Sequence, residues 1–175
     1  MSEPLEIEIK FAVSRPDLVR AMIDDPDPAH LAGFVADGEV HVAVMTDRYL
    51  DTEVGGALFR NGMRARLRVA ASGVVLAVKR KGVVSAGGVT TRVELQGPAT
   101  AAMEPARWPE SDAKAVLIET VDGMPLVEIA ALRQVRHTRL LRRGDALVEV
   151  SLDRMTALAG DHALAQRVEL EAELK

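Results

Sequence analysis

The sequence contains no cysteine, which excludes disulfide bonds and thiolate ligands for a metal ion. Aromatic residues make up only 3% of the 175 residues, so the sequence offers no evident platform on which a nucleobase would stack. It also lacks an apolar run of the roughly 20 residues that a membrane-spanning helix needs, and its first residues do not resemble a signal peptide. We therefore expect a cytoplasmic protein that makes no contact with a membrane.

Acidic and basic residues nearly balance, with 26 Asp and Glu against 22 Lys and Arg and a net charge of -4. The chain thus has no general basic field for DNA or RNA, and we expect no nucleic-acid partner. Its four histidines lie far apart without the spacing of a zinc site, and it has no Walker loop, dinucleotide-binding glycine motif or internal repeat. The length suits one domain with its own core.

The N-terminal segment, residues 5–11, alternates strictly between apolar and charged side chains. This period of two predicts a β-strand that carries Glu6, Glu8 and Lys10 on one face. Two carboxylates at this spacing can share a divalent cation through oxygen ligands, and the lysine can hold a phosphate group as a point charge. An amphipathic edge strand that is protected by its charges would show the same pattern.

The C-terminal segment, residues 168–175, repeats the pattern and places Glu169, Glu171 and Glu173 on one face. One glutamate-lined strand at each terminus predicts an antiparallel sheet that closes on itself, with the two terminal strands as neighbours. The interior of this barrel would be charged and its outside apolar, which inverts the usual small barrel. Helices expected over residues 15–23, 29–36 and 111–121 would cover part of the outside.

The middle of the chain carries basic side chains in strand phase, on residues 63–69, 74–81 and 90–96. The bases expected to face one cavity are Arg64, Arg66, Arg68, Lys79, Lys81 and Arg92. Unpaired bases in one lumen would repel one another, so an anion is expected among them. In the strand expected over residues 126–141 both faces carry arginines, and the alternation does not decide which of them point inward.

A later segment, residues 147–153, alternates again and places Glu149, Ser151 and Asp153 inside, whereas residues 155–164 are expected to form a loop with at most a short strand. The inward acids therefore come from strands near the termini and the bases from the middle ones. Salt bridges across a barrel explain part of such a pattern, but not its segregation by sign. A polyphosphate bound together with Mg²⁺ or Mn²⁺ does, because the bases would hold phosphate oxygens and the acids the cation.

Several motifs follow one another in an order typical of one superfamily. They are Glu-x-Glu-x-Lys at residues 6–10, Asp-Arg-Tyr-Leu-Asp-Thr at 47–52, the arginine strand at 64–68, Arg92 with Glu94, and the closing Glu-x-Glu strand. The chain resembles the CYTH superfamily, also called triphosphate tunnel metalloenzymes, although Leu50 and Ala65 replace residues common in it. The resemblance implies an α+β fold: a closed antiparallel β-barrel (tunnel) of about eight strands with helices packed on the outside. Residues 1–175 would form this single domain.

The resemblance and the charge pattern together predict roles for the inward residues. The predicted metal ligands are Glu6, Glu8, Asp153, Glu169 and Glu171, and the predicted catalytic residues are Glu6, Glu8, Lys10 and Glu171. The predicted substrate-binding residues are Lys10, Arg64, Arg66, Arg68, Lys79, Lys81, Arg92, Arg133 and Arg136, of which the last two rest on the resemblance alone. The predicted activity is metal-dependent hydrolysis of inorganic triphosphate, through positioning and electrostatic stabilisation of phosphoryl transfer.

Within the superfamily, the arginine strand, the loop at residues 86–88 and the closing strand look most like the CYTH part of bacterial CYTH-CHAD inorganic triphosphatases. We therefore expect the chain to be the N-terminal part of a longer protein with a C-terminal CHAD domain, or a homo-oligomer, in which the outward apolar residues of the terminal strands are covered. An adenylyl cyclase, or a triphosphatase acting on an organic triphosphate such as thiamine triphosphate or a nucleotide, is the alternative on the same scaffold. A non-catalytic polyphosphate-binding module is the third, but it would not need the acidic pair of the first strand.

Overall fold

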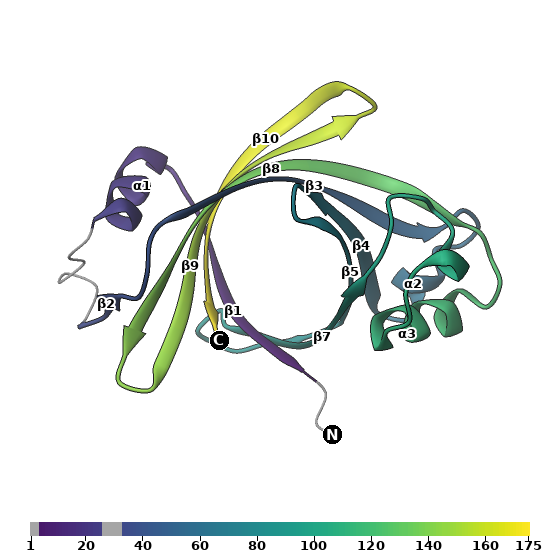
Figure 1. Cartoon of the computed structure of the whole chain (residues 1–175), viewed down its shortest axis with the longest axis horizontal. Coiled ribbons are helices and arrows are strands. Elements are labelled where there is room, and N and C mark those ends of the chain that lie inside the picture. Colours follow the sequence, from purple (N-terminus) through teal and green to yellow (C-terminus); the bar gives the residue numbers. More distant parts are fainter. Residues whose placement is uncertain (1–3, 26–32) are drawn as a thin grey trace.

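The computed structural model describes residues 4–25 and 33–175 of the chain. In this part ten strands form one sheet, and eight of them close into an antiparallel barrel, which Figure 1 shows end-on. The barrel strands are β1 (Leu5–Ala12), β3 (His41–Thr52), β4 (Met63–Ala70), β5 (Gly73–Arg80), β7 (Thr90–Pro98), β8 (Leu126–Arg143), β9 (Ala146–Ala159) and β10 (His162–Leu174). Their order is β1-β10-β9-β8-β3-β4-β5-β7, and β7 pairs with β1 to close the ring. The predicted closed barrel is confirmed.

The two terminal strands lie side by side, because β1 pairs with β10 on one edge and with β7 on the other. Residues that are opposite each other on neighbouring strands point to the same face of a sheet. Lys10 lies opposite Glu171 on β10, and Glu6 lies opposite Arg92 on β7. The register therefore brings acids from the termini next to bases from the middle of the chain.

The apolar core lies outside the barrel, between its wall and two helices, α2 (Ala57–Arg60) and α3 (Asp112–Val121). Leu67 and Leu76 point outward from β4 and β5 and pack with Leu58 of α2, Leu117 of α3 and Trp108, all at most 2% exposed. Trp108 follows the short 3-10 helix η1 (Pro105–Arg107). Burial of apolar surface, at about 25 cal/mol per Å², thus stabilises the wall from outside and leaves the interior free for charged groups.

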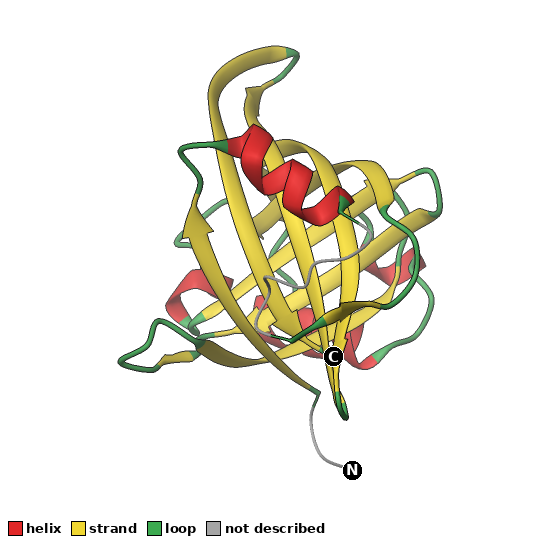
Figure 2. Ribbon diagram, turned by 90° about the vertical axis from the view of Figure 1, so that its left-hand side faces the viewer, coloured by secondary structure: helices red, strands yellow, loops and turns green. Residues whose placement is uncertain are grey.

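A third helix, α1 (Pro16–Asp24), lies across the outer face of β8 and β9, as Figures 1 and 2 show. Arg139 of β8 holds its end, since Nη1 donates to the carbonyl oxygens of Ile23 at 2.8 Å and Asp25 at 2.5 Å. No helix in the described ranges is long and apolar enough to cross a membrane.

The helix expected over residues 29–36 is wrong at its end. Residues 26–32 lie outside the described part of the chain, and residues 35 and 36 form the short strand β2 (Val35–Ala36), which pairs with β8. The far end of the long strand β8, at Leu141 and Arg142, supplies the backbone partners of this segment. A second short strand, β6 (Val83–Val84), pairs with β7 in the same way.

The loop expected over residues 155–164 is also wrong. β9 continues to Ala159 and β10 begins at His162, so these residues form a long hairpin that projects from the barrel in Figure 1. Its register shifts between Ala163 and Ala165. The segment is rich in alanine and leucine on both faces and therefore lacks the alternation that reveals a half-buried strand.

The outward apolar residues of the terminal strands are partly open to solvent. Leu5 is 62%, Phe11 48% and Leu174 46% exposed. That a CHAD domain or a second copy covers them stays a prediction.

Candidate functional site

A cavity of about 830 Å³ opens into the barrel and is lined by residues of the barrel strands β1, β3, β4, β5 and β7, of helix α2 and of the short strand β6. Among its described lining residues one, Glu8, is acidic and eight are basic. The basic ones are Lys10, Arg60, Arg64, Arg66, Lys79, Arg80, Lys81 and Arg92. The structure thus brings together six of the predicted substrate-binding residues, of which Lys10, Arg64 and Lys81 are exposed. Arg60 and Arg80 are additional bases that strand alternation did not reveal.

Three carboxylates meet beside this cavity, from Glu6 and Glu8 on β1 and Glu171 on β10. One oxygen of each lies within 4.8 Å of the other two, and the residues are only 6%, 2% and 6% exposed. Nζ of Lys10 lies between two of these carboxylates, 3.2 Å from Oε2 of Glu8 and 2.9 Å from Oε2 of Glu171. Three carboxylates at this separation offer the oxygen ligands that a hard divalent cation takes, so the three residues fit such a cation.

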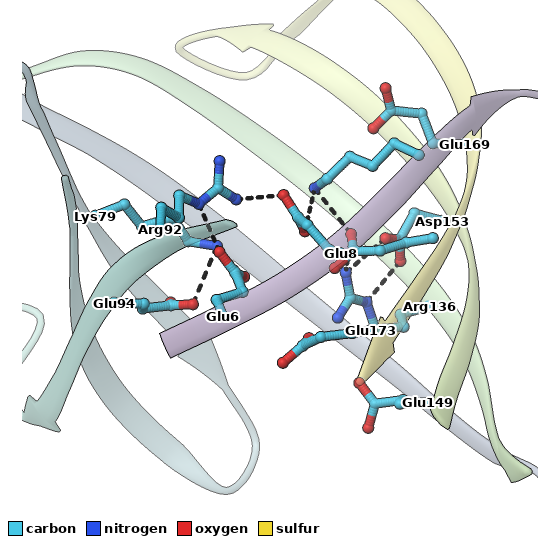
Figure 3. A network of polar contacts seen from close by, with 12 residues as sticks. Glu6, Glu8, Lys79, Arg92, Glu94, Arg136, Glu149, Asp153, Glu169 and Glu173 are labelled. Carbon is cyan, nitrogen blue, oxygen red and sulfur yellow. Dashed lines mark hydrogen bonds and ion pairs between the residues drawn. The ribbon is translucent and has the colours of Figure 1, made fainter. Parts of the chain in front are cut away.

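The other two predicted metal ligands do not belong to this group of three. Asp153 accepts hydrogen bonds from Nε and Nη2 of Arg136, at 2.7 and 2.6 Å. Glu169 forms an ion pair with Arg167 at 2.5 Å, and Figure 3 shows it pointing away from Glu6 and Glu8. As placed, these two carboxylates face their own arginines.

The bases of the cavity wall are held by acids, as Figure 3 shows. Arg92 donates from Nε to Glu6 at 2.5 Å and from Nη2 to Glu8. Lys79 lies 2.6 Å from a Glu6 oxygen and 3.1 Å from a Glu94 oxygen. Lys10 pairs with Glu171 at 2.9 Å. The expectation of unpaired bases is therefore wrong for these residues, because the strand order places β1 beside β7, which alternation within one strand does not show.

The carboxylates of the group differ in acidity. Burial raises the pKa of Glu6, but hydrogen bonds and charge from Lys79 and Arg92 outweigh it and lower the pKa to about 2. For Glu171, burial is likewise outweighed by the charges of Lys10 and Arg136, and its pKa falls to about 2. The pKa of Glu8 is raised, by burial and by the adjacent Glu171. Negative charge is thus least compensated at Glu8, where a cation would be most favourable.

Three predicted substrate-binding arginines lie elsewhere. Arg68 points inward but binds Asp47 with Nε and Nη2, each at 2.8 Å, and is not among the cavity-lining residues. Arg136 also points inward, beside Asp153. Arg133 lies on the outer face, where it lines a separate groove with Arg154. The prediction that Arg133 faces the lumen is wrong, because residues three apart on a regular strand have opposite faces.

These features define a tunnel-type barrel: a closed antiparallel sheet with its apolar core outside and a buried carboxylate group beside a basic cavity inside. The chain belongs to the CYTH domain family, whose model matches residues 4–175. Members of the CYTH superfamily are triphosphatases or cyclases. No curated protein matches the chain significantly in sequence.

Three solved structures have a similar fold. A candidate adenylyl cyclase from Hippeastrum, described as having a dominant triphosphatase activity, is 19% identical with a TM-score of 0.67, over 96% of this chain and 79% of that one. A candidate adenylate cyclase from Bacillus halodurans is 18% identical with a TM-score of 0.58, over 99% and 82%. A Pyrococcus horikoshii protein is 15% identical with a TM-score of 0.56, over 97% and 77%. At these identities the likeness establishes the fold alone.

Proposed function

We propose that this chain hydrolyses inorganic triphosphate in its barrel, with Mg²⁺ or Mn²⁺ held by the carboxylates of Glu6, Glu8 and Glu171. The observation that carries the proposal is the position of this buried acidic group beside a cavity in which, apart from Glu8, every charged lining residue that the structure describes is basic. A linear triphosphate with a divalent cation presents the complementary charges.

The residues present fit an oxygen-bound cation. Glu6, Glu8 and Glu171 offer three carboxylates within one small volume, and the chain has no cysteine that would favour a softer metal. When bound, the cation would polarise phosphoryl oxygens and offset the charge that develops on them. Asp153 and Glu169 are the next candidates, once the ion pairs that hold them are broken.

The basic wall supplies the remaining stabilisation. Lys79, Arg66 and Arg92 are partly buried and reach the same cavity from three adjacent strands, so phosphate oxygens between them would accept charge-assisted hydrogen bonds from fixed donors. Lys10 lies beside the carboxylates and would hold the phosphoryl group nearest to the cation. One of the acids would orient the attacking water, as phosphoryl transfer requires little beyond positioning and electrostatics.

An organic triphosphate is the second candidate substrate, favoured by one observation. Phe59 lines the cavity and is 74% exposed, so a base or thiazolium ring attached to the triphosphate would find an aromatic face there. This ring was not evident from the low aromatic content of the sequence, because its place at the cavity depends on α2.

The proposal is tested by phosphate release from inorganic triphosphate, ATP and thiamine triphosphate, each with Mg²⁺, Mn²⁺ or EDTA. We expect the highest kcat/KM for inorganic triphosphate and loss of turnover in EDTA. Preference for ATP or thiamine triphosphate would favour the second candidate, and cyclic AMP as product would identify a cyclase. Tight binding of triphosphate without turnover under any condition would identify a binding module and contradict the proposal.

Substitutions in the basic wall should weaken substrate binding. We expect Lys79→Ala and Arg66→Ala each to raise the Kd for inorganic triphosphate by about 10- to 100-fold, since each removes a charge-assisted hydrogen bond worth roughly 1.5–3 kcal/mol. Arg133→Ala on the outer face is the matched control and should leave Kd unchanged. Titration calorimetry measures these values. If Lys79→Ala and Arg66→Ala, like the control, keep the Kd of the wild-type protein, the substrate binds elsewhere.

A further inference from the structure

Asp47 is a buried acid beside two arginines of β4, and the proposed reaction assigns no role to it. It lies on β3 opposite Arg68 of β4 and is 0% exposed. Its Oδ1 accepts from Nε of Arg68, and its Oδ2 accepts from Nη2 of Arg68 and Nη1 of Arg66, all at 2.8 Å. One carboxylate therefore joins two arginines.

The two arginines are not equivalent. Arg66 lines the cavity, whereas Arg68 does not. Both donors of Arg68 that face Asp47 are used in a two-point contact, and Nη2 also lies 3.4 Å from Oε1 of Gln134. Arg66 gives one nitrogen to Asp47, its Nε has no hydrogen-bond partner in the described structure, and its Nη2 is 4.0 Å from Glu94. Arg66 thus lines the cavity with an Nη2 that has only this long contact to Glu94, whereas its Nε is buried and closed to a ligand.

We infer that Asp47 is a positioning residue, which Arg68 fixes and which in turn holds the guanidinium of Arg66 in the cavity wall for a phosphate group. Arg68 then acts through Asp47 and is not itself a substrate ligand. The inference rests on the proposed function for the identity of the anion, inorganic triphosphate.

The physical reason is preorganisation. A free arginine side chain loses about 2 kcal/mol of rotamer entropy when it is fixed, and donors that are fixed before the substrate arrives do not pay this cost on binding. Burial raises the pKa of Asp47, but the hydrogen bond from Arg68 and the charges of both arginines lower it overall. The carboxylate therefore stays ionised and continues to accept hydrogen bonds from both arginines. The planar guanidinium of Arg68 makes a rigid two-point contact that lysine would not reproduce.

The test is a double-mutant cycle on the equilibrium binding of inorganic triphosphate, measured by calorimetry in EDTA, together with KM and kcat in the presence of Mg²⁺. Asp47→Ala should raise Kd and KM by about tenfold, which corresponds to one lost charge-assisted hydrogen bond. In an Arg66→Met background the same substitution should change Kd by less than twofold. Independent effects that multiply would overturn the inference.

A third variant distinguishes a role of Asp47 in substrate binding from a role in stability alone. Asp47→Ala alone leaves two arginines without their buried acid and should lower Tm, whereas Asp47→Ala combined with Arg68→Met removes one excess charge and should recover part of that loss. We expect Kd to stay raised in this double variant, because Arg66 still lacks its anchor. Recovery of Kd together with Tm would show that Asp47 serves only the fold.

The wild-type protein tells the failure of the two proposals apart. If it binds no triphosphate, both proposals are wrong. If it binds triphosphate but does not hydrolyse it, only the proposed activity is wrong, and the double-mutant cycle still decides the role of Asp47.

Discussion

Glu8→Gln should reduce metal-dependent triphosphate turnover by about 100-fold or more while the barrel stays folded, since one of three carboxylate ligands becomes a neutral amide. Glu8 is the residue to choose because it is only 2% exposed, has an oxygen within 4.8 Å of an oxygen of each of the other two carboxylates, and is the member of the group whose pKa is raised. The concentration of Mg²⁺ or Mn²⁺ that gives half-maximal rate should rise in parallel.

The matched control is Glu149→Gln. Glu149 lies on β9, which β10 separates from β1, and pairs with Lys175 at 3.2 Å, outside the group of three carboxylates. Its substitution makes the same chemical change on the same inner face and should alter turnover by less than twofold. Equal activity of the Glu8 variant and the wild type across a metal titration would exclude Glu8 as a ligand.

The expected stability of the Glu8→Gln variant follows from the raised pKa of Glu8 in the wild-type protein. A carboxyl group whose pKa is raised by folding stabilises the fold while it is protonated, and this contribution is lost as the pH rises through the folded-state pKa. Glutamine cannot ionise, so without metal Glu8→Gln should unfold no more easily than the wild type at neutral pH. The pKa shifts of Glu6 and Glu171 have the opposite sign, because folding lowers both values from 4.5 to about 2. These two residues stabilise the fold while they are ionised, and this stabilisation is lost as the pH falls from 4.5 towards 2.

The sequence alone predicts the terminal strands well, because one side of each is charged and the other apolar. The alternation around Glu6 and Glu171 was therefore sufficient to predict the barrel, its inward acids and, with the other motifs, the CYTH family. The hairpin between β9 and β10 was missed where that contrast is absent, in a stretch of alanine and leucine. Arg133 and Arg136 were not separated because both faces of β8 carry arginines.

Pairing between strands is the part that local patterns do not contain. The two arginine partners of Asp47 depend on the register of β3 with β4. The contact of Arg92 with Glu6 and Glu8 spans more than 80 positions of sequence and depends on β7 closing onto β1. A base that such closure places between two buried acids acts as a counter-charge as well as a candidate substrate ligand.

Arg92→Met should therefore lower the free energy of unfolding by about 3 kcal/mol in EDTA, because it leaves the buried carboxylates of Glu6 and Glu8 without a shared partner. Mg²⁺ or Mn²⁺ should recover much of this loss, since a cation bound by the same carboxylates restores the missing positive charge and stabilises the folded state by mass action. Urea unfolding with and without metal measures both effects.

Arg48→Met is the control for this substitution. Arg48 pairs with Glu128 at 2.5 Å on the outer wall, where the two side chains are 25% and 36% exposed. An ion pair open to solvent contributes about 0–1 kcal/mol, and neither Arg48 nor Glu128 belongs to the group of acidic residues that could hold a cation in the described part of the chain. The stability of this variant should hence fall little, and metal should raise it by the same amount as in the wild type. If the Arg92 variant loses no more stability than the Arg48 variant, or if its loss is the same with and without metal, Arg92 does not provide the counter-charge of the carboxylate group.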